Sequence, residues 1–236
     1  MALILNIETS TEVCSVSLAK DGQLLFKKES LEGMNHSRLL TVFIEDLFSE
    51  NRIQINTIDA VAVSKGPGSY TGLRIGVSVA KGLCYGLNIP LISINSLEIL
   101  ASFAARNLSG FGLPINDSPV LLCPMIDARR MEVYTALYNL HGEELKPVSA
   151  EIIEEHFLSD LLENHKILFF GNGAQKCKTI INHKNAFFEG PISTSAQFMQ
   201  RLSEEKFKNK EFEDVAYFEP FYLKNFVATI PRNKIL

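Results

Sequence analysis

Two stretches of the sequence open in the same way, and this repetition constrains the fold more than any other feature. In the first, an apolar run ends at Glu8, a strand-like segment follows, and the chain turns at Gly22. In the second, an apolar run ends at Asp127, another strand-like segment follows, and the chain turns at Gly142. Each copy predicts a strand, an acid-bearing turn, a second strand and a hairpin turn. The pattern indicates a weak internal duplication.

Helix and strand periodicities fill the space between these repeats. Either Asn35 or Ser37 can cap a helix whose apolar residues occupy a broad face. A short β-branched run at 58–64 predicts a buried strand, a helix is expected from about residue 69 to 87, and Ser96 is expected to cap a further helix. This alternation predicts an α/β fold of two lobes, with mixed sheets flanked by helices.

The division between the lobes is expected in a stretch that breaks regular structure. Residues 109–119 contain two glycines and two prolines, which favour a loop or hinge. A chain of 236 residues can form one substantial core or two smaller ones. We therefore predict a first lobe of residues 1–108 and a second, reduced lobe of residues 109–236.

Composition excludes several classes of protein. With 46% hydrophobic and 21% charged residues and a net charge of −4, the chain is globular and offers no basic surface for tight RNA binding on its own. No apolar stretch is long enough to span a membrane, and the N-terminus lacks the basic segment of a secretory signal, so we expect a cytoplasmic protein. The four cysteines are far apart, without a C-x-x-C pair, and are expected to be reduced and mostly buried.

A glycine-rich string, Gly-Pro-Gly-Ser-Tyr-Thr-Gly-Leu-Arg-Ile-Gly, runs from Gly66 to Gly76. Backbone N–H groups at a strand-to-helix loop of this kind can bind phosphate. However, the P-loop and the dinucleotide-binding pattern both require glycine where Thr71 stands, and the P-loop also requires a lysine next. A P-loop enzyme and a Rossmann dehydrogenase are therefore excluded.

Two helices are candidates for docking another protein. Small residues recur at every fourth position of the helix after Ser69, so one of its faces is flat and lets another backbone come close. That face packs either on the protein's own sheet or on a partner helix. The helix after Asn35 has more apolar surface than its own sheet needs. The predicted partner-interface residues are Leu39, Leu40, Phe43, Leu47, Gly72, Leu73, Gly76 and Ala80.

The acid-bearing turns and the glycine-rich string resemble those of the TsaB family, also called YeaZ. The strings that carry the resemblance are Ile7-Glu-Thr-Ser, the Gly66 to Gly76 string with Ala80-Lys-Gly-Leu after it, and Asp127-Ala-Arg with Glu132-Val-Tyr. The resemblance is close over residues 1–140 and looser in the tail, through Gly171-Asn-Gly-Ala and Tyr222-Leu-Lys. It implies the duplicated two-lobed fold of actin, hexokinase and the heat-shock ATPases (ASKHA).

The resemblance also implies a role in making N6-threonylcarbamoyladenosine (t6A) in tRNA, next to the anticodon. A TsaB protein would act there as a non-catalytic scaffold and activator, with no cofactor, no metal and no catalytic residue of its own. The implied partners are TsaD, a catalytic paralogue of the same fold, and the small ATPase TsaE, with tRNA bound only through the complex. The shared fold implies a weak homodimer when the paralogue is absent.

An independent ATPase or phosphotransferase of the same fold is the alternative function. In such an enzyme the two turns would hold nucleotide phosphates between the lobes. We therefore count Glu8, Thr9, Ser10 and Asp127 as candidates for a residual nucleotide contact.

A glycoprotease-like metallopeptidase is a more remote alternative. The catalytic paralogue carries two metal-binding histidines four residues apart, shortly after an Ile-Pro or Val-Pro dipeptide, a spacing that places both on one helix face. After Ile89-Pro90 the corresponding residues are Ser96 and Leu100. Because leucine cannot bind a metal, we expect no metal site here.

Overall fold

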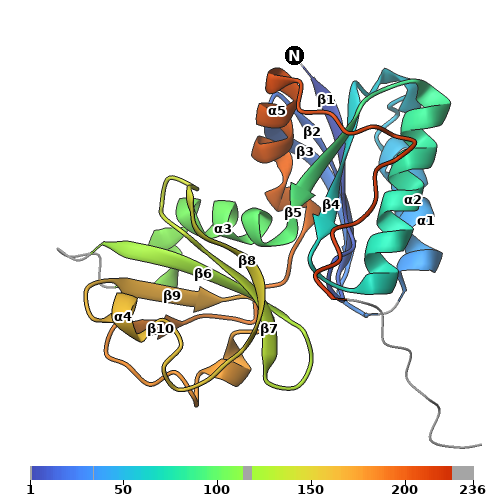
Figure 1. The fold of residues 1–236 in the computed structure, drawn as a ribbon. Helices are drawn as coiled ribbons and strands as arrows, with labels where there is room; N and C mark the ends of the chain where they lie inside the picture. The colour runs from blue at the N-terminus through green and yellow to red at the C-terminus, as the bar shows by residue number, and fades with distance from the viewer. Residues whose placement is uncertain (1, 34, 114–118, 225–236) are drawn as a thin grey trace, which may run out of the picture.

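The computed structural model describes residues 2–33, 35–113 and 119–224 and forms two lobes, each with a five-stranded sheet (Figure 1). The first sheet has the order β3-β2-β1-β4-β5, with bounds β1 Leu3–Glu8, β2 Cys14–Lys20, β3 Gln23–Ser30, β4 Ala60–Gly66 and β5 Leu91–Asn95. The second has the order β10-β9-β6-β7-β8, with bounds β6 Val120–Asp127, β7 Glu132–Tyr138, β8 Glu144–Ile152, β9 Lys166–Phe170 and β10 Ala186–Phe188.

The two sheets have the same topology. The first strand of each set, β1 or β6, pairs antiparallel with the second strand and parallel with the fourth. Glu8 and Asp127 are the last residues of these two equivalent strands. The predicted duplication is therefore confirmed, and so is the two-lobed α/β fold with mixed sheets.

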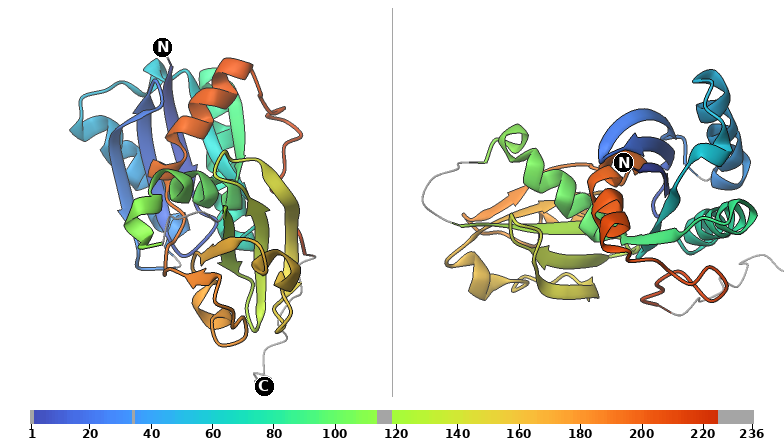
Figure 2. Two further views of the ribbon diagram at one scale, coloured as in Figure 1. Left: turned by 90° about the vertical axis from the view of Figure 1, so that its left-hand side faces the viewer. Right: turned by 90° about the horizontal axis from the view of Figure 1, so that it is seen from above.

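Helices cover both faces of the first sheet, as Figures 1 and 2 show. The helices are α1 His36–Glu50, α2 Tyr70–Leu87, α3 Ser96–Arg106, α4 Ser159–Leu162 and α5 Gln200–Asn209. Side chains alternate between the faces of a strand, so Leu5 and Ile7 face the core under α1 and α2, whereas Ile4 faces α3 and α5. Helix α3 also contributes Leu97 and Leu100 to the core of the second lobe. The lobes therefore share α3.

The C-terminal part of the chain returns to the first lobe. After β10, Phe198 and Met199 pack against Ile4 on the first sheet, and α5 follows on the same face. The predicted second lobe of 109–236 thus differs from the structure at its C-terminal end, because apolar side chains between residues 196 and 218 pack into the cores on the two faces of the first sheet. We retain a division near residue 108 as a proposal.

Two local features qualify the expectations for α3 and the hinge. Helix α3 is capped by Asn95, whose side chain accepts the N–H of Leu97 at 2.8 Å, and not by Ser96. The expected hinge at 109–119 lies partly outside the described residues, which omit 114–118.

Within the part of the chain that the structure describes, no helix combines the length and apolar character that a membrane crossing requires.

Candidate functional site

The first acid-bearing turn is buried, and its hydrogen bonds come from within the chain. The Glu8 side chain is 0% exposed, and its Oε1 accepts the N–H of Ser10 at 2.6 Å. Burial raises the pKa of Glu8, while hydrogen bonds from Ser10, Ser64 and Thr194 oppose that rise. Its Oε2 has no hydrogen-bond partner among the described residues. Burial therefore disfavours the charged form of this carboxyl.

The glycine-rich string packs directly on this turn. The N–H of Ser69 donates to the carbonyl of Ser10 at 2.6 Å, and the Thr9 hydroxyl donates to the carbonyl of Gly72 at 2.8 Å. A Cβ at Gly72 would lie 2.1 Å from the Thr9 carbonyl oxygen, and one at Gly76 would lie 2.3 Å from Thr9 Oγ1. The glycines are therefore required because the end of β1 lies against α2.

This packing corrects the predicted partner interface. Of the two alternatives for the small-residue face of α2, the structure supports packing within the lobe. Six of the eight predicted residues are buried in the lobe, namely Leu40, Leu47, Gly72, Leu73, Gly76 and Ala80. They point inward because α1 and α2 place these faces toward β1, β2 and β4. Contact with a partner stays a prediction for Leu39 and Phe43, which are only partly buried.

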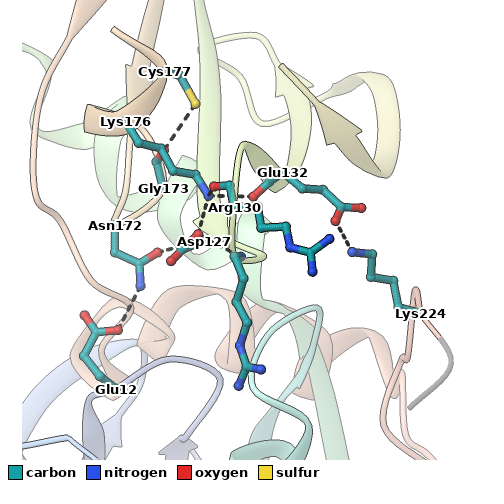
Figure 3. A network of polar contacts seen from close by, with 10 residues as sticks. Glu12, Asp127, Arg130, Glu132, Asn172, Gly173, Lys176, Cys177 and Lys224 are labelled. Atoms are coloured by element: carbon teal, nitrogen blue, oxygen red, sulfur yellow. Dashed lines mark hydrogen bonds and ion pairs between the residues drawn. The ribbon is translucent and has the colours of Figure 1, made fainter. Parts of the chain in front are cut away.

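The second acid-bearing turn is organised around a lysine (Figure 3). Lys176 Nζ donates to the carboxylate of Asp127, to the carbonyl of Arg130 at 2.7 Å and to the carbonyl of Glu132 at 2.7 Å. The same Asp127 carboxylate accepts the backbone N–H of Arg129 at 2.9 Å. The ammonium group therefore neutralises the acid and fixes the backbone of the turn.

The two turns are linked through side chains that lie between the lobes. Asn172, just after β9, accepts the N–H of Asp127 at 3.0 Å and donates to Glu12 at 2.8 Å (Figure 3). Ser193 donates to the other oxygen of Glu12 at 2.7 Å, and Thr194 Oγ1 lies 3.0 Å from Thr11 Oγ1. Hydrogen bonds within the chain thus occupy the region where the alternative function would place phosphates.

The four candidate nucleotide contacts are accordingly engaged by the protein itself. Glu8, Thr9 and Ser10 contact the glycine-rich string or each other, and Asp127 contacts Lys176. None of the four lines either of two surface cavities of about 340 and 690 Å³. These contacts favour a structural role for the turns, and nucleotide binding there stays an untested prediction.

The β6–β7 turn has an unusual backbone. Arg129 and Arg130 have φ values of 70° and 51°, in the left-handed region that glycine or asparagine usually occupies. This conformation costs about 1 to 2 kcal/mol per residue with a side chain. The N–H of Glu132 closes the turn on the carbonyl of Arg129 at 3.2 Å. Both arginines are exposed.

The sequence did not identify Lys176, Asn172 and Glu12 as parts of the site. The available signal was the Gly171-Asn-Gly string after an apolar run, since a Cβ at Gly171 would lie 2.3 Å from the carbonyl oxygen of Met125. Paired glycines after a buried strand can indicate close approach of two backbones. The string therefore marks where β9 meets the end of β6.

The tail of the described chain lies along α2 (Figure 1). Lys81 Nζ donates to the carbonyls of Ala216 and Phe218 at 3.1 and 3.0 Å. The ring of Tyr222 lies 4.8 Å from that of Tyr70, and its hydroxyl accepts from Arg74 Nε at 3.3 Å. Part of the outer surface of α2 is therefore covered by the chain itself.

No cluster of three or more potential metal-ligating acids, histidines or cysteines occurs among the described residues. Ser96 and Leu100, at the positions compared with metal-binding histidines, are both buried in α3. All four cysteines are free and buried, as expected. Burial raises the pKa of the Cys84 and Cys123 thiols to about 12, so neither is a reactive thiolate at neutral pH.

Known proteins share both the sequence and the fold. The family model for TsaD, tRNA N6-adenosine threonylcarbamoyltransferase, matches residues 31–231. The tRNA threonylcarbamoyladenosine biosynthesis protein TsaB of Bacillus subtilis is 33% identical over 228 residues, which cover 94% of this chain and 93% of that protein. The protein of the same name from Escherichia coli is 30% identical and covers 95% of this chain and 96% of its own.

Solved structures agree with this relationship. YeaZ from Pseudomonas aeruginosa is 25% identical with a TM-score of 0.75, and the match covers 94% of this chain and 100% of that one. A second Pseudomonas aeruginosa structure, of a protein described as similar to peptidase YeaZ, is 26% identical with a TM-score of 0.81 over 95% of this chain and 100% of that one. The predicted resemblance is confirmed: the chain belongs to the TsaB (YeaZ) family of tRNA threonylcarbamoyladenosine biosynthesis proteins, within the wider family that the TsaD model describes.

Proposed function

We propose that this protein serves t6A synthesis as a non-catalytic subunit that binds and activates a TsaD-like transferase. Its membership of the TsaB family supports the role in t6A synthesis. The observation that carries the non-catalytic role is that both acid-bearing turns interact with other residues of the same chain. Glu8 is fully buried, and Asp127 is paired with Lys176. Neither carboxyl is free to act on a substrate, so the protein's contribution lies on its outer surfaces.

The proposed docking surface for the TsaD-like partner is the outer side of α1 and α2, defined by Leu39, Val42, Phe43, Gly82 and Tyr85. The Tyr85 side chain is 85% exposed and that of Val42 is 46% exposed. Outside the adjacent backbone of α2, no atom of the described residues lies within 4 Å of a Cβ built at Gly82, so a partner helix can approach α2 closely there. Exposed aromatic and aliphatic side chains around a glycine suit a helix-to-helix interface.

The remaining partners follow from the same proposal. A TsaE-like ATPase binds the pair, and tRNA binds through the assembled complex, since the chain alone has a net charge of −4. The same α1–α2 surface supports a weak homodimer when the partner is absent, because partner and protein share a fold. The protein works in the cytoplasm, where the tRNA is modified.

Two measurements test this function. Depletion of the protein should abolish t6A in tRNA, as measured by nucleoside mass spectrometry, and unchanged t6A would contradict the assignment. The purified protein should form a complex with the TsaD-like partner in size-exclusion chromatography and should not hydrolyse ATP alone. Steady ATP turnover by the isolated chain would instead support the phosphotransferase alternative.

Gly82→Leu tests the docking surface. The new side chain projects into open space, so the monomer should fold, but it should hold a partner helix away and prevent complex formation. Gly82→Ala is the matched control, and its binding to the partner should be closer to that of the wild-type protein. A Gly82→Leu protein that still binds the partner would place the interface elsewhere.

A further inference from the structure

Two arginines at the β6–β7 turn have no role in the proposed function. Arg129 and Arg130 are both exposed, and within residues 2–33, 35–113 and 119–224 neither side chain forms an ion pair or a hydrogen bond. Arg129 is the last residue of the Asp127-Ala-Arg string by which the sequence resembles its family, and Arg130 directly follows that string. The turn therefore presents two guanidinium groups with no internal partner.

The acids of this turn do not compensate the two guanidinium charges. The carboxylate of Asp127 is paired with Lys176, and that of Glu132 is paired with Lys224. Figure 3 shows both lysines beside the turn, one on each side of Glu132. With each carboxylate paired to a lysine, the positive charge of the arginines is left for an external anion.

The backbone conformation indicates that these two positions carry arginine for the chemistry of its guanidinium group. With φ values of 70° and 51°, the two positions would be less strained as glycine. Lys176 holds the turn in place through the carbonyls of Arg130 and Glu132. Arginine contributes nothing to the hydrogen bonds of this turn that glycine could not, because those bonds use only backbone atoms of the two residues.

The shape of the surface selects the kind of anion. Both arginines are exposed, and neither lines the cavities of about 340 and 690 Å³, so the two guanidinium groups lie on an exposed turn. Open guanidinium groups suit an extended polyanion, whereas a small nucleotide would need a concave site. We propose that Arg129 and Arg130 bind the phosphate backbone of tRNA when the protein is in its complex, an inference that rests on the proposed function.

The test measures tRNA affinity of the complex with the TsaD-like partner, by fluorescence anisotropy of a labelled unmodified tRNA transcript at several salt concentrations. The double variant Arg129→Gln and Arg130→Gln should weaken binding about five- to tenfold. Each lost phosphate contact should also lower the slope of log affinity against log salt by about 1. Arg201→Gln, an exposed arginine on α5, is the matched control and should change neither quantity.

The double variant Arg129→Gly and Arg130→Gly separates binding from stability. Glycine relieves the backbone, so this protein should melt no lower than wild type and yet lose tRNA affinity to the same extent. Unchanged tRNA affinity in both double variants would overturn the inference. So would loss of ATP binding by the complex with tRNA affinity retained, which would assign the arginines to a nucleotide. Complex formation by the wild-type chain is measured before any tRNA is added. Its failure would contradict the proposed function instead.

Discussion

Replacing Gly72 by alanine should destabilise the protein, although alanine is the better helix former. The substitution gains about 1 kcal/mol of helix propensity. Against this, the new Cβ would lie 2.1 Å from the carbonyl oxygen of Thr9, an atom of the backbone at the end of β1. That oxygen must move by about 1 Å to reach ordinary contact, and the hydrogen bond from Ser69 to the adjacent Ser10 carbonyl must distort with it. Overpacking of this kind costs about 1 to 3 kcal/mol and occasionally more.

The severity of this clash places the cost at the upper end, so the net loss should be about 2 kcal/mol. For a chain of this size, that loss lowers Tm by roughly 4 to 8 °C. Gly82→Ala in the same helix is the matched control. Beyond the neighbouring helix backbone, no described residue lies within 4 Å of its Cβ, and the variant should gain stability of about 0.5 to 1 kcal/mol. Urea unfolding of both variants measures the difference. Equal and positive changes would refute the close packing of α2 on β1.

Three further outcomes follow from the same contacts. Gly76→Leu should prevent folding of the monomer, because its side chain would enter the space of Thr9 Oγ1; a normal circular dichroism melt would contradict this. Because burial raises the pKa of Glu8 above 4.5, wild-type stability should fall as pH rises above that value, and Glu8→Gln, measured by denaturant titration, should flatten this dependence. Lys176→Met should destabilise the protein by about 1 to 3 kcal/mol by leaving Asp127 and two carbonyls without their donor; an unchanged Tm would argue that water replaces the lysine.

The duplication was predictable because it depends on local patterns. An apolar run that ends in an acid, followed by an alternating segment and a turn glycine, identifies the same pair of strands in both lobes. The placement of α5 was not predictable in the same way. Its helix carries many charges, and its contact with Ile4 comes from residues nearly the whole chain apart. Periodicity reveals that such a helix exists, but not which sheet it covers.

The glycine face of α2 shows a second limit. The spacing of Gly72, Gly76 and Ala80 correctly indicated a face that another backbone can approach. Sequence spacing could not identify that backbone, because a strand end of the same lobe and a helix of a partner leave the same requirement for small residues. Thr9 proved to be the neighbour. Gly82 lies outside this row of small residues, is exposed, and has no such contact with the described part of the chain, so it is the better candidate for contact with a helix of another protein.

The two equivalent turns are held from within the protein by opposite chemistry, and this contrast explains why the protein's activity is expected on its surface. At the first turn, Glu8 is buried and burial raises its pKa, while the adjacent Thr9 and Ser10 contact the glycine-rich string. At the second, Asp127 stays partly exposed and forms an ion pair with Lys176. A buried acid cannot contact a ligand, whereas a paired acid can shape a turn that does. Only the second turn therefore keeps side chains free to meet another molecule, and those side chains are arginines.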